Sequence, residues 1–184
     1  YFKDLVRSII HKSPLESYAA FFVIDIDDFK HVNDSFGHPV GDELLCRLAD
    51  RINLISGPDT CFSRFGGDEF VGMLAGFETA ADAETAARQT LMSLAGTYEV
   101  ASQSLAVTIS SGIVINRSHA FDLQQMMIKS DLALYESKVR GKGISTLFAE
   151  AMDERYQKRQ RLKADLKKAI RERQLNVFYQ PIIK

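Results

Sequence analysis

The sequence of 184 residues predicts an α/β fold of the α+β type, with a mixed central sheet flanked by helices. A short apolar run at residues 19–26, rich in aromatic and β-branched side chains, predicts a buried strand. Leucine and isoleucine recur at helical spacing over 41–55, which predicts an amphipathic helix. Two strand-like segments, 60–65 and 69–75, are separated by a pair of glycines and predict a hairpin.

The other elements follow from the same patterns. Apolar residues at helical spacing predict a first helix over 2–10, which Ser13-Pro14 ends. The polar stretch after the buried strand has room for one helical turn at 29–33. After the hairpin we predict a helix over 79–94 capped by Thr79, strands over 98–100 and 105–115, a helix over 121–140 that a Gly-Lys-Gly stretch ends, and a strand over 144–148.

This order contains the βαββαβ kernel of a ferredoxin-like sheet, so helices are expected on one face. Gly112, inside a long strand, predicts a bulge or a close backbone approach. After Phe148 a long charged helix over 152–173 and a strand over 175–183 follow, with a boundary near Ala149. Acidic residues are interspersed among the basic ones, which favours a solvated linker helix over a nucleic-acid arm.

Composition excludes several classes of protein. Hydrophobic residues make up 46% and charged residues 26%, so the chain is globular rather than disordered. A net charge of −1 argues against non-specific binding of nucleic acid or of an anionic membrane. No apolar run is long enough to span a bilayer. Cys46 and Cys61 form no CxxC pattern, so we expect a reduced cytosolic protein in which both are small buried hydrophobes.

Acidic side chains gather at the ends of two predicted strands. Asp25 belongs to the run Asp-Ile-Asp-Asp where the buried strand ends, and Asp68 and Glu69 lie at the hairpin. If the two strands are neighbours, these carboxylates converge at one edge of the sheet. Oxygen-rich clusters suit Mg²⁺ (or Mn²⁺), which shares its ligands with substrate phosphates. The alternative is a set of separate surface acids at strand ends.

Other polar residues point to a nucleotide. Lys138 and Lys142 lie near the end of the last core helix, where they could reach phosphates; cations at a helix C-terminus are the alternative. Asn33 and Asp42 form an amide and carboxylate pair that could read a guanine edge. The alternative for Asp42 is a helix N-cap. His38, between them, is more often a hydrogen-bonding loop residue than a catalyst.

Five stretches carry a resemblance to a known family. They are Phe-Val-Ile-Asp-Ile-Asp-Asp-Phe-Lys at 22–30, Asn-Asp-Ser-Phe-Gly-His at 33–38, Gly-Asp at 41–42, Arg-Phe-Gly-Gly-Asp-Glu-Phe at 64–70 and Asp-Leu-Ala-Leu-Tyr-Glu-Ser-Lys at 131–138. In order and spacing, residues 21–148 resemble the GGDEF domain of bacterial diguanylate cyclases. The resemblance implies a palm-type sheet like that of nucleotidyl cyclases. It also implies condensation of two GTP molecules into cyclic di-GMP, with loss of two pyrophosphates, in a face-to-face homodimer.

The resemblance also implies roles for individual residues. Asp25, the Ile26 carbonyl and Asp68 would bind Mg²⁺, with Glu69 at the same site, and Asp68 is the candidate to deprotonate the 3′-hydroxyl. The remaining implied contacts are to substrate: guanine by Asn33 and Asp42 with His38 nearby, and the phosphates by Lys30, Lys138 and Lys142. Phe29 is a further expected substrate-binding residue. Phosphoryl transfer depends mostly on positioning and charge stabilisation, which metals and lysines supply.

The C-terminal part resembles the beginning of an EAL phosphodiesterase domain, through the run that ends Phe-Tyr-Gln-Pro-Ile at 178–182. We therefore expect a GGDEF domain at 1–149 without its N-terminal motif, a linker helix at 150–174 and a first EAL strand at 175–184. The expected parent is a GGDEF–EAL hybrid, with this domain in the cytoplasm even if the parent is anchored in a membrane. The expected partners are GTP, a second copy and the EAL domain, without nucleic acid or membrane contact.

Two departures from the family pattern matter for regulation and substrate binding. The Arg-x-x-Asp product site upstream of the motif corresponds to Gly57 and Thr60, so product feedback there is expected to be absent. Lys142 stands where arginine is usual, which keeps the charge but loses the bidentate fork. The alternative to an active cyclase is a silent GTP-binding domain that regulates the attached EAL domain. A cyclase of another nucleotide is disfavoured by the Asn33 and Asp42 pair.

Overall fold

The computed structural model describes residues 2–174 and residue 178. The chain divides into two compact units, Tyr1–Phe148 and Ala149–Lys184. In the part that the structure describes, no helix combines the length and the apolar character needed to cross a bilayer.

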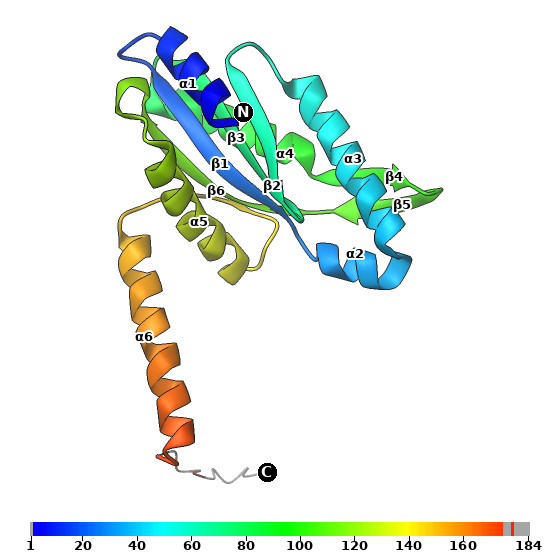
Figure 1. The fold of residues 1–184 in the computed structure, drawn as a ribbon, viewed down its shortest axis with the longest axis vertical. Helices are drawn as coiled ribbons and strands as arrows, with labels where there is room; N and C mark the ends of the chain where they lie inside the picture. Colours follow the sequence, from blue (N-terminus) through cyan, green and yellow to red (C-terminus); the bar gives the residue numbers. More distant parts are fainter. Residues whose placement is uncertain (1, 175–177, 179–184) are drawn as a thin grey trace, which may run out of the picture. The chain divides into compact units, whose positions relative to one another are not determined.

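The first unit is built on a five-stranded sheet in the order β2-β3-β1-β6-β7 (Figure 1). These strands are β2 (Thr60–Gly66), β3 (Glu69–Phe77), β1 (Tyr18–Ile26), β6 (Ile109–Arg117) and β7 (Ser145–Leu147). Neighbouring strands are antiparallel except for β6 and β7, which are parallel. The predicted mixed sheet is confirmed, and its most apolar strand, β1, is central.

Helices cover both faces of this sheet, so the expectation of helices on one face is wrong. They are α1 (Phe2–Lys12), α3 (His38–Ile55), α4 (Ala80–Leu94) and α5 (Leu123–Val139). The even-numbered side chains of β1 pack in a core with α3 and α4, and the odd-numbered ones pack in a second core with α1 and α5. Because both faces are covered, β1 is apolar at successive positions and does not alternate.

The predicted strand over 105–115 is two strands. β4 (Gly96–Val100) and β5 (Gln103–Val107) form a separate two-stranded hairpin, and β6 begins only at Ile109. Ala101 and Ser102 have φ values of 47° and 63°, the left-handed conformation that a two-residue hairpin turn needs. Apolar residues continue through the junction, so the sequence pattern does not mark the break between the hairpin and the sheet.

Helix boundaries differ most before the hairpin. α2 (Phe29–Phe36) spans two turns where one was predicted, and α3 begins at His38, three residues before the predicted start. Gly41, which suggested a helix start, is buried inside α3. The start of α4 is as predicted, because the Thr79 hydroxyl accepts a hydrogen bond from the Asp82 amide at 3.1 Å.

Gly112 is a close approach rather than a bulge. The pairing of β1 with β6 runs without interruption from Tyr18 to Ile26. A Cβ atom on Gly112 would lie 1.9 Å from the Ser130 carbonyl oxygen and 2.4 Å from the Leu134 amide nitrogen. The backbone of α5 therefore packs directly on β6 at this residue, and only glycine leaves the space for it.

The two cysteines differ in environment. Cys61 is buried, and burial raises the pKa of its thiol to about 12. Cys46 is exposed on α3, so the expectation that both are buried hydrophobes is wrong for this residue. Its helical position falls outside the apolar stripe of α3, which the spacing of the neighbouring leucines already indicates.

The second unit is described from Ala149 to Gln174 and at Phe178. It contains α6 (Ala151–Arg171), a helix with acidic residues in its first turn and basic residues in its last. Leu162, Leu166 and Ile170 form its exposed apolar stripe. The predicted strand over 175–183 lies outside the described residues, apart from Phe178.

Candidate active site

The glycine pair and the carboxylates that follow it form the turn between β2 and β3. Gly66 pairs with Glu69, so Gly67 and Asp68 make the tip of the hairpin. Gly67 has a φ of 54°, which a residue without a Cβ atom adopts at little cost. The Arg64 Nε atom donates a hydrogen bond to the Gly67 carbonyl oxygen at 2.9 Å and braces the turn. This geometry holds Asp68 and Glu69 next to each other, both partly buried.

The carboxylates of the two strands converge as predicted. Asp25 and Glu69 are directly paired residues of β1 and β3. The Ile26 amide donates to the Asp68 carbonyl oxygen at 3.4 Å, which brings the tip of the hairpin beside the end of β1. Three acidic side chains and the Ile26 backbone therefore share one corner of the sheet.

Asp25 is the most buried acid of this corner, with 7% of its surface exposed. Burial raises the pKa of its carboxyl, and the charges of Asp68 and Glu69 act in the same direction. Lys138 opposes them, because its Nζ atom donates to Asp25 Oδ2 at 2.6 Å. A buried carboxylate beside two like charges is stabilised by any cation placed there.

The chemistry of this corner suits a hard cation. Carboxylate and carbonyl oxygens are the ligands that Mg²⁺ prefers, and protein sites for Mg²⁺ commonly take further ligands from substrate phosphates. Within the described residues, no group of three or more His, Cys, Asp or Glu side chains is arranged to hold a metal by itself.

The other two acids of the Asp-Ile-Asp-Asp run face a different partner. Asp28, in the left-handed conformation at φ 56°, accepts from Lys142 Nζ at 2.7 Å. Asp27 is buried and accepts from the amide of Gly143 at 2.8 Å. The sequence alone makes the three acids of this run look equivalent, but only Asp25 faces the hairpin.

In the exposed ion pair of Asp28 and Lys142, each group shifts the pKa of the other. The Lys142 ammonium lowers the pKa of Asp28, and the Asp28 carboxylate raises the pKa of Lys142. Lys138 and Lys142 thus each contact a carboxylate at the end of β1. Lys138 therefore lies at the acidic corner through Asp25, whereas Lys142 lies beside it through the exposed Asp28.

Asn33 of α2 lies against Gly41, the residue before Asp42. A Cβ atom on Gly41 would lie 2.0 Å from Asn33 Oδ1 and 3.2 Å from the Phe29 ring, so the carboxamide rests on the bare glycine. Asp42 follows directly and is exposed. The N-cap of α3 is Gly37, so Asp42 lies inside the helix and its interpretation as a helix N-cap is wrong.

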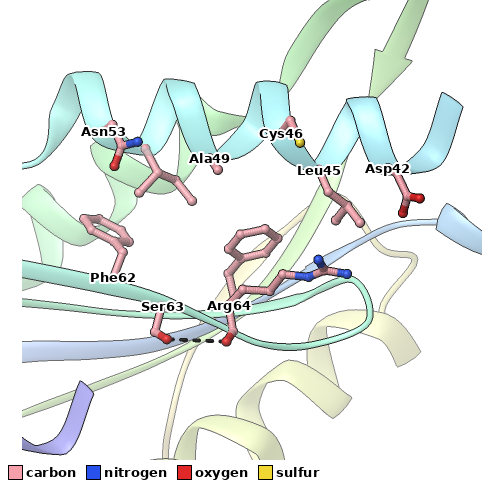
Figure 2. Close-up of a pocket in the computed structure, with 10 residues that line it drawn as sticks. Asp42, Leu45, Cys46, Ala49, Asn53, Phe62, Ser63 and Arg64 are labelled. Atoms are coloured by element: carbon pink, nitrogen blue, oxygen red, sulfur yellow. Dashed lines mark hydrogen bonds between the residues drawn. The ribbon is translucent and has the colours of Figure 1, made fainter. Parts of the chain in front are cut away.

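A pocket of about 360 Å³ lies between α3 and the β2–β3 hairpin, within the size range of small-molecule sites. Figure 2 shows Asp42 and the Arg64 guanidinium at one end of it and Asn53 and Phe62 at the other. The lining is Asp42, Leu45, Cys46, Ala49, Ile52, Asn53, Phe62, Ser63, Arg64 and Phe70. The apolar walls and one carboxylate suit a planar heterocycle with hydrogen-bond donors.

Comparison with known proteins bears directly on this site. The family model "Diguanylate cyclase, GGDEF domain" matches residues 1–143. The chain belongs to the GGDEF family. This GGDEF domain has the mixed sheet and flanking helices of solved structures from the family. One is the active GGEEF domain of a diguanylate cyclase from Vibrio cholerae, with a TM-score of 0.66, 27% identity and coverage of 81% of this chain and 94% of that one.

Curated relatives of the domain differ in their named activities. The bifunctional diguanylate cyclase/cyclic di-GMP phosphodiesterase MucR of Pseudomonas aeruginosa is 33% identical over 88% of this chain. The cyclic di-GMP phosphodiesterase PdeR of Escherichia coli is 32% identical over 98% of this chain. The chain spans 24% of the first relative and 27% of the second.

Of the seven predicted substrate residues of this GGDEF domain, only Asp42 is on the lining of this pocket. The other six, Phe29, Lys30, Asn33, His38, Lys138 and Lys142, are not on it. Phe29 is buried in the core under Gly41. Lys30 is exposed on α2, and His38 is exposed as the first residue of α3. Sequence reasoning missed Arg64 and the apolar lining from α3. In the sequence, the only signal for Arg64 was its place in the Arg-Phe-Gly-Gly-Asp-Glu-Phe stretch. The only signal for the apolar lining was the apolar face of the helix that became α3.

Proposed function

We propose that this GGDEF domain is a diguanylate cyclase that condenses two GTP molecules into cyclic di-GMP and releases two pyrophosphates. The observation that carries the proposal is the pairing of Asp25 with Glu69 on adjacent strands, with Lys138 bound to Asp25. Carboxylates for a metal and lysines for phosphates then lie at one corner. Each domain has one such corner, so two domains must face each other for one GTP to attack the other.

The residues at the corner take distinct roles in the proposal. Asp25, the Ile26 carbonyl, Asp68 and Glu69 would hold Mg²⁺ or Mn²⁺, which would activate the attacking hydroxyl and stabilise the pyrophosphate. Asp68, at the tip of the hairpin, would accept the proton of the 3′-hydroxyl. Lys138 and Lys142 would neutralise phosphate charge, with Lys30 on the neighbouring helix.

The guanine base is proposed to bind at the end of the pocket where Asp42 lies. The Asp42 carboxylate can accept hydrogen bonds from N1–H and the exocyclic amine of guanine, and adenine has no such donor pair. Asn33, held against Gly41, can reach the same edge of the base, and His38 lies nearby in sequence at the start of α3. Phe29 supports Asn33 from below by packing.

Replacing Asp42 with alanine is expected to weaken GTP binding by about 10- to 100-fold, the worth of a hydrogen bond to a charged group, and to leave ATP binding unchanged. The GTP over ATP preference therefore falls by the same factor. Isothermal titration calorimetry with both nucleotides measures it. Asp50→Ala, at an exposed position of the same helix, is the matched control. An unchanged preference in Asp42→Ala would show that this carboxylate does not read the base.

A second function is favoured by one observation. PdeR, which aligns with nearly the whole chain, is named for phosphodiesterase activity alone. A silent GGDEF domain would bind GTP through the same residues and regulate an attached EAL domain. In this scheme residues 150–174 are a linker helix and 175–184 begin the EAL domain, within a cytoplasmic part of the parent.

Measuring cyclic di-GMP formation distinguishes the diguanylate cyclase from the silent regulatory domain. The chain is incubated at high concentration with GTP and Mg²⁺, and products are separated by chromatography. Cyclic di-GMP supports the cyclase, whereas calorimetric GTP binding without product supports the regulator. Product feedback at this site is expected to be absent, because Gly57 and Thr60 stand where an Arg and Asp pair would be required.

A further inference from the structure

The loop after α5 has an unusual backbone. Gly141, Lys142 and Gly143 have φ values of 123°, 65° and 63°, so three successive residues lie at positive φ. A side chain at positive φ is disfavoured, and Lys142 is the middle residue. Such a conformation persists only where the surroundings hold it, and it is found preferentially at functional sites.

The restraint on this loop comes from the end of β1. Asp27 is 8% exposed, and its Oδ2 atom accepts from the Gly143 amide at 2.8 Å and from the Thr108 hydroxyl at 2.9 Å. Its Oδ1 atom accepts from the Ser110 hydroxyl at 2.6 Å. The Asp27 amide in turn donates to the Thr108 carbonyl oxygen at 3.0 Å, which fixes the acid to the sheet.

The loop is also tied to the helix that precedes it. The Lys142 amide donates to the Ser137 carbonyl oxygen at 3.1 Å, and the Lys142 ammonium reaches Asp28 at 2.7 Å. Asp27 thus holds the backbone on one side of Lys142, and α5 holds it on the other. The backbone of Lys142 is therefore held on both sides, and its ammonium pairs with the exposed Asp28 at the end of β1.

We propose that Asp27 is a positioning residue, whose carboxylate holds the Gly141–Gly143 loop so that Lys142 is pre-organised for the terminal phosphates of GTP. This rests on the proposed function, in which Lys142 binds phosphate. A flexible lysine loses conformational freedom on binding, and a preformed backbone reduces that loss. The proposed function gives the Asp27 carboxylate no contact with the phosphates or the metal.

The test is a series of nucleotide titrations with Mg²⁺ on the whole chain. Asp27→Ala removes the charged acceptor of the Gly143 amide and leaves it only the Ser110 hydroxyl, at 3.2 Å. The variant is expected to weaken GTP binding about tenfold, the scale of one charge-assisted hydrogen bond. GMP binding is expected to change less than about twofold, because GMP has no terminal phosphates for Lys142 to bind. In a Lys142→Ala background the Asp27→Ala effect is expected to vanish.

A second variant changes the loop itself instead of Asp27. Gly143→Ala places a side chain at φ 63° with only ordinary contacts to Thr108, so it disturbs the loop and leaves Asp27 in place. The same selective loss of GTP binding is expected. Gly76→Ala, also at positive φ with open space around it, is the matched control and is expected to retain GTP affinity.

Each result has a defined meaning. Equal losses for GTP and GMP, or additivity with Lys142→Ala, would show that Asp27 only stabilises the fold and would overturn the inference. Unchanged GTP binding in both loop variants would also overturn it. If Asp27→Ala does not fold, Gly143→Ala decides the outcome alone. A wild-type chain that binds no GTP contradicts the proposed function as well, which distinguishes that failure from a failure of the inference alone.

Discussion

Replacing Gly112 with alanine is expected to destabilise the domain by about 3 kcal/mol or more, because overpacked cores rarely relax without cost. A Cβ atom at this residue would meet backbone atoms of α5, at 1.9 Å from the Ser130 oxygen and 2.4 Å from the Leu134 nitrogen. Backbone cannot rotate away as a side chain can, so α5 must move off β6. Urea denaturation followed by circular dichroism measures the change in the free energy of unfolding.

The control for this prediction is another glycine. Gly57 lies in the loop before β2, and a Cβ atom there would meet nothing within 4 Å. Gly57→Ala is expected to change stability by less than about 0.5 kcal/mol, as is usual for surface substitutions. If Gly112→Ala were as stable as Gly57→Ala, the direct packing of α5 on β6 would be wrong.

Asp25→Asn is expected to reduce cyclic di-GMP formation by about a thousandfold or more, because electrostatic and metal contributions to such reactions are among the largest. The amide keeps the shape of the side chain but gives up the charge that pairs with Lys138 and that is proposed to bind a metal. The fold is expected to remain, since a buried carboxylate that is desolvated contributes little net stability. Turnover under saturating GTP and Mg²⁺ measures the first effect.

Thermal unfolding shows whether Asp25→Asn loses turnover because the reaction is impaired or because the protein is less stable. A melting temperature equal to or above that of the wild-type chain, together with lost turnover, assigns Asp25 to the reaction. Asp50→Asn, an exposed acid on α3, is the control and is expected to retain full turnover. An Asp25→Asn protein with wild-type turnover would remove this residue from the site.

The convergence of the acids was predictable because strand adjacency and a two-residue turn leave little freedom. A hairpin at Gly66-Gly67 places Glu69 at the first pair of β3, and the apolar run of β1 demands a central place in the sheet. The burial of both faces of that sheet could also have been predicted from the sequence. Successive apolar residues in β1 indicate two buried faces, and the βαββαβ order alone does not.

Other features depend on contacts that no local pattern encodes. Gly41 looks like a helix start, yet it lies inside α3, where Asn33 of α2 rests on it. The acids of the Asp-Ile-Asp-Asp run look alike, yet the turn at Asp28 sends two of them toward the loop after α5. The break between β5 and β6 at Thr108 has no local sequence signal either, because the hydroxyl and carbonyl of Thr108 hydrogen-bond to Asp27, which is distant in sequence.

The most direct test of the central proposal is product formation by the wild-type chain beside Asp68→Asn. Both proteins are incubated with GTP and Mg²⁺, and cyclic di-GMP and pyrophosphate are quantified by chromatography and a coupled assay. The proposal predicts two pyrophosphates per cyclic di-GMP in the wild-type chain and no product from the variant. GTP binding by the wild-type chain without cyclic di-GMP, or equal product from Asp68→Asn, would contradict it.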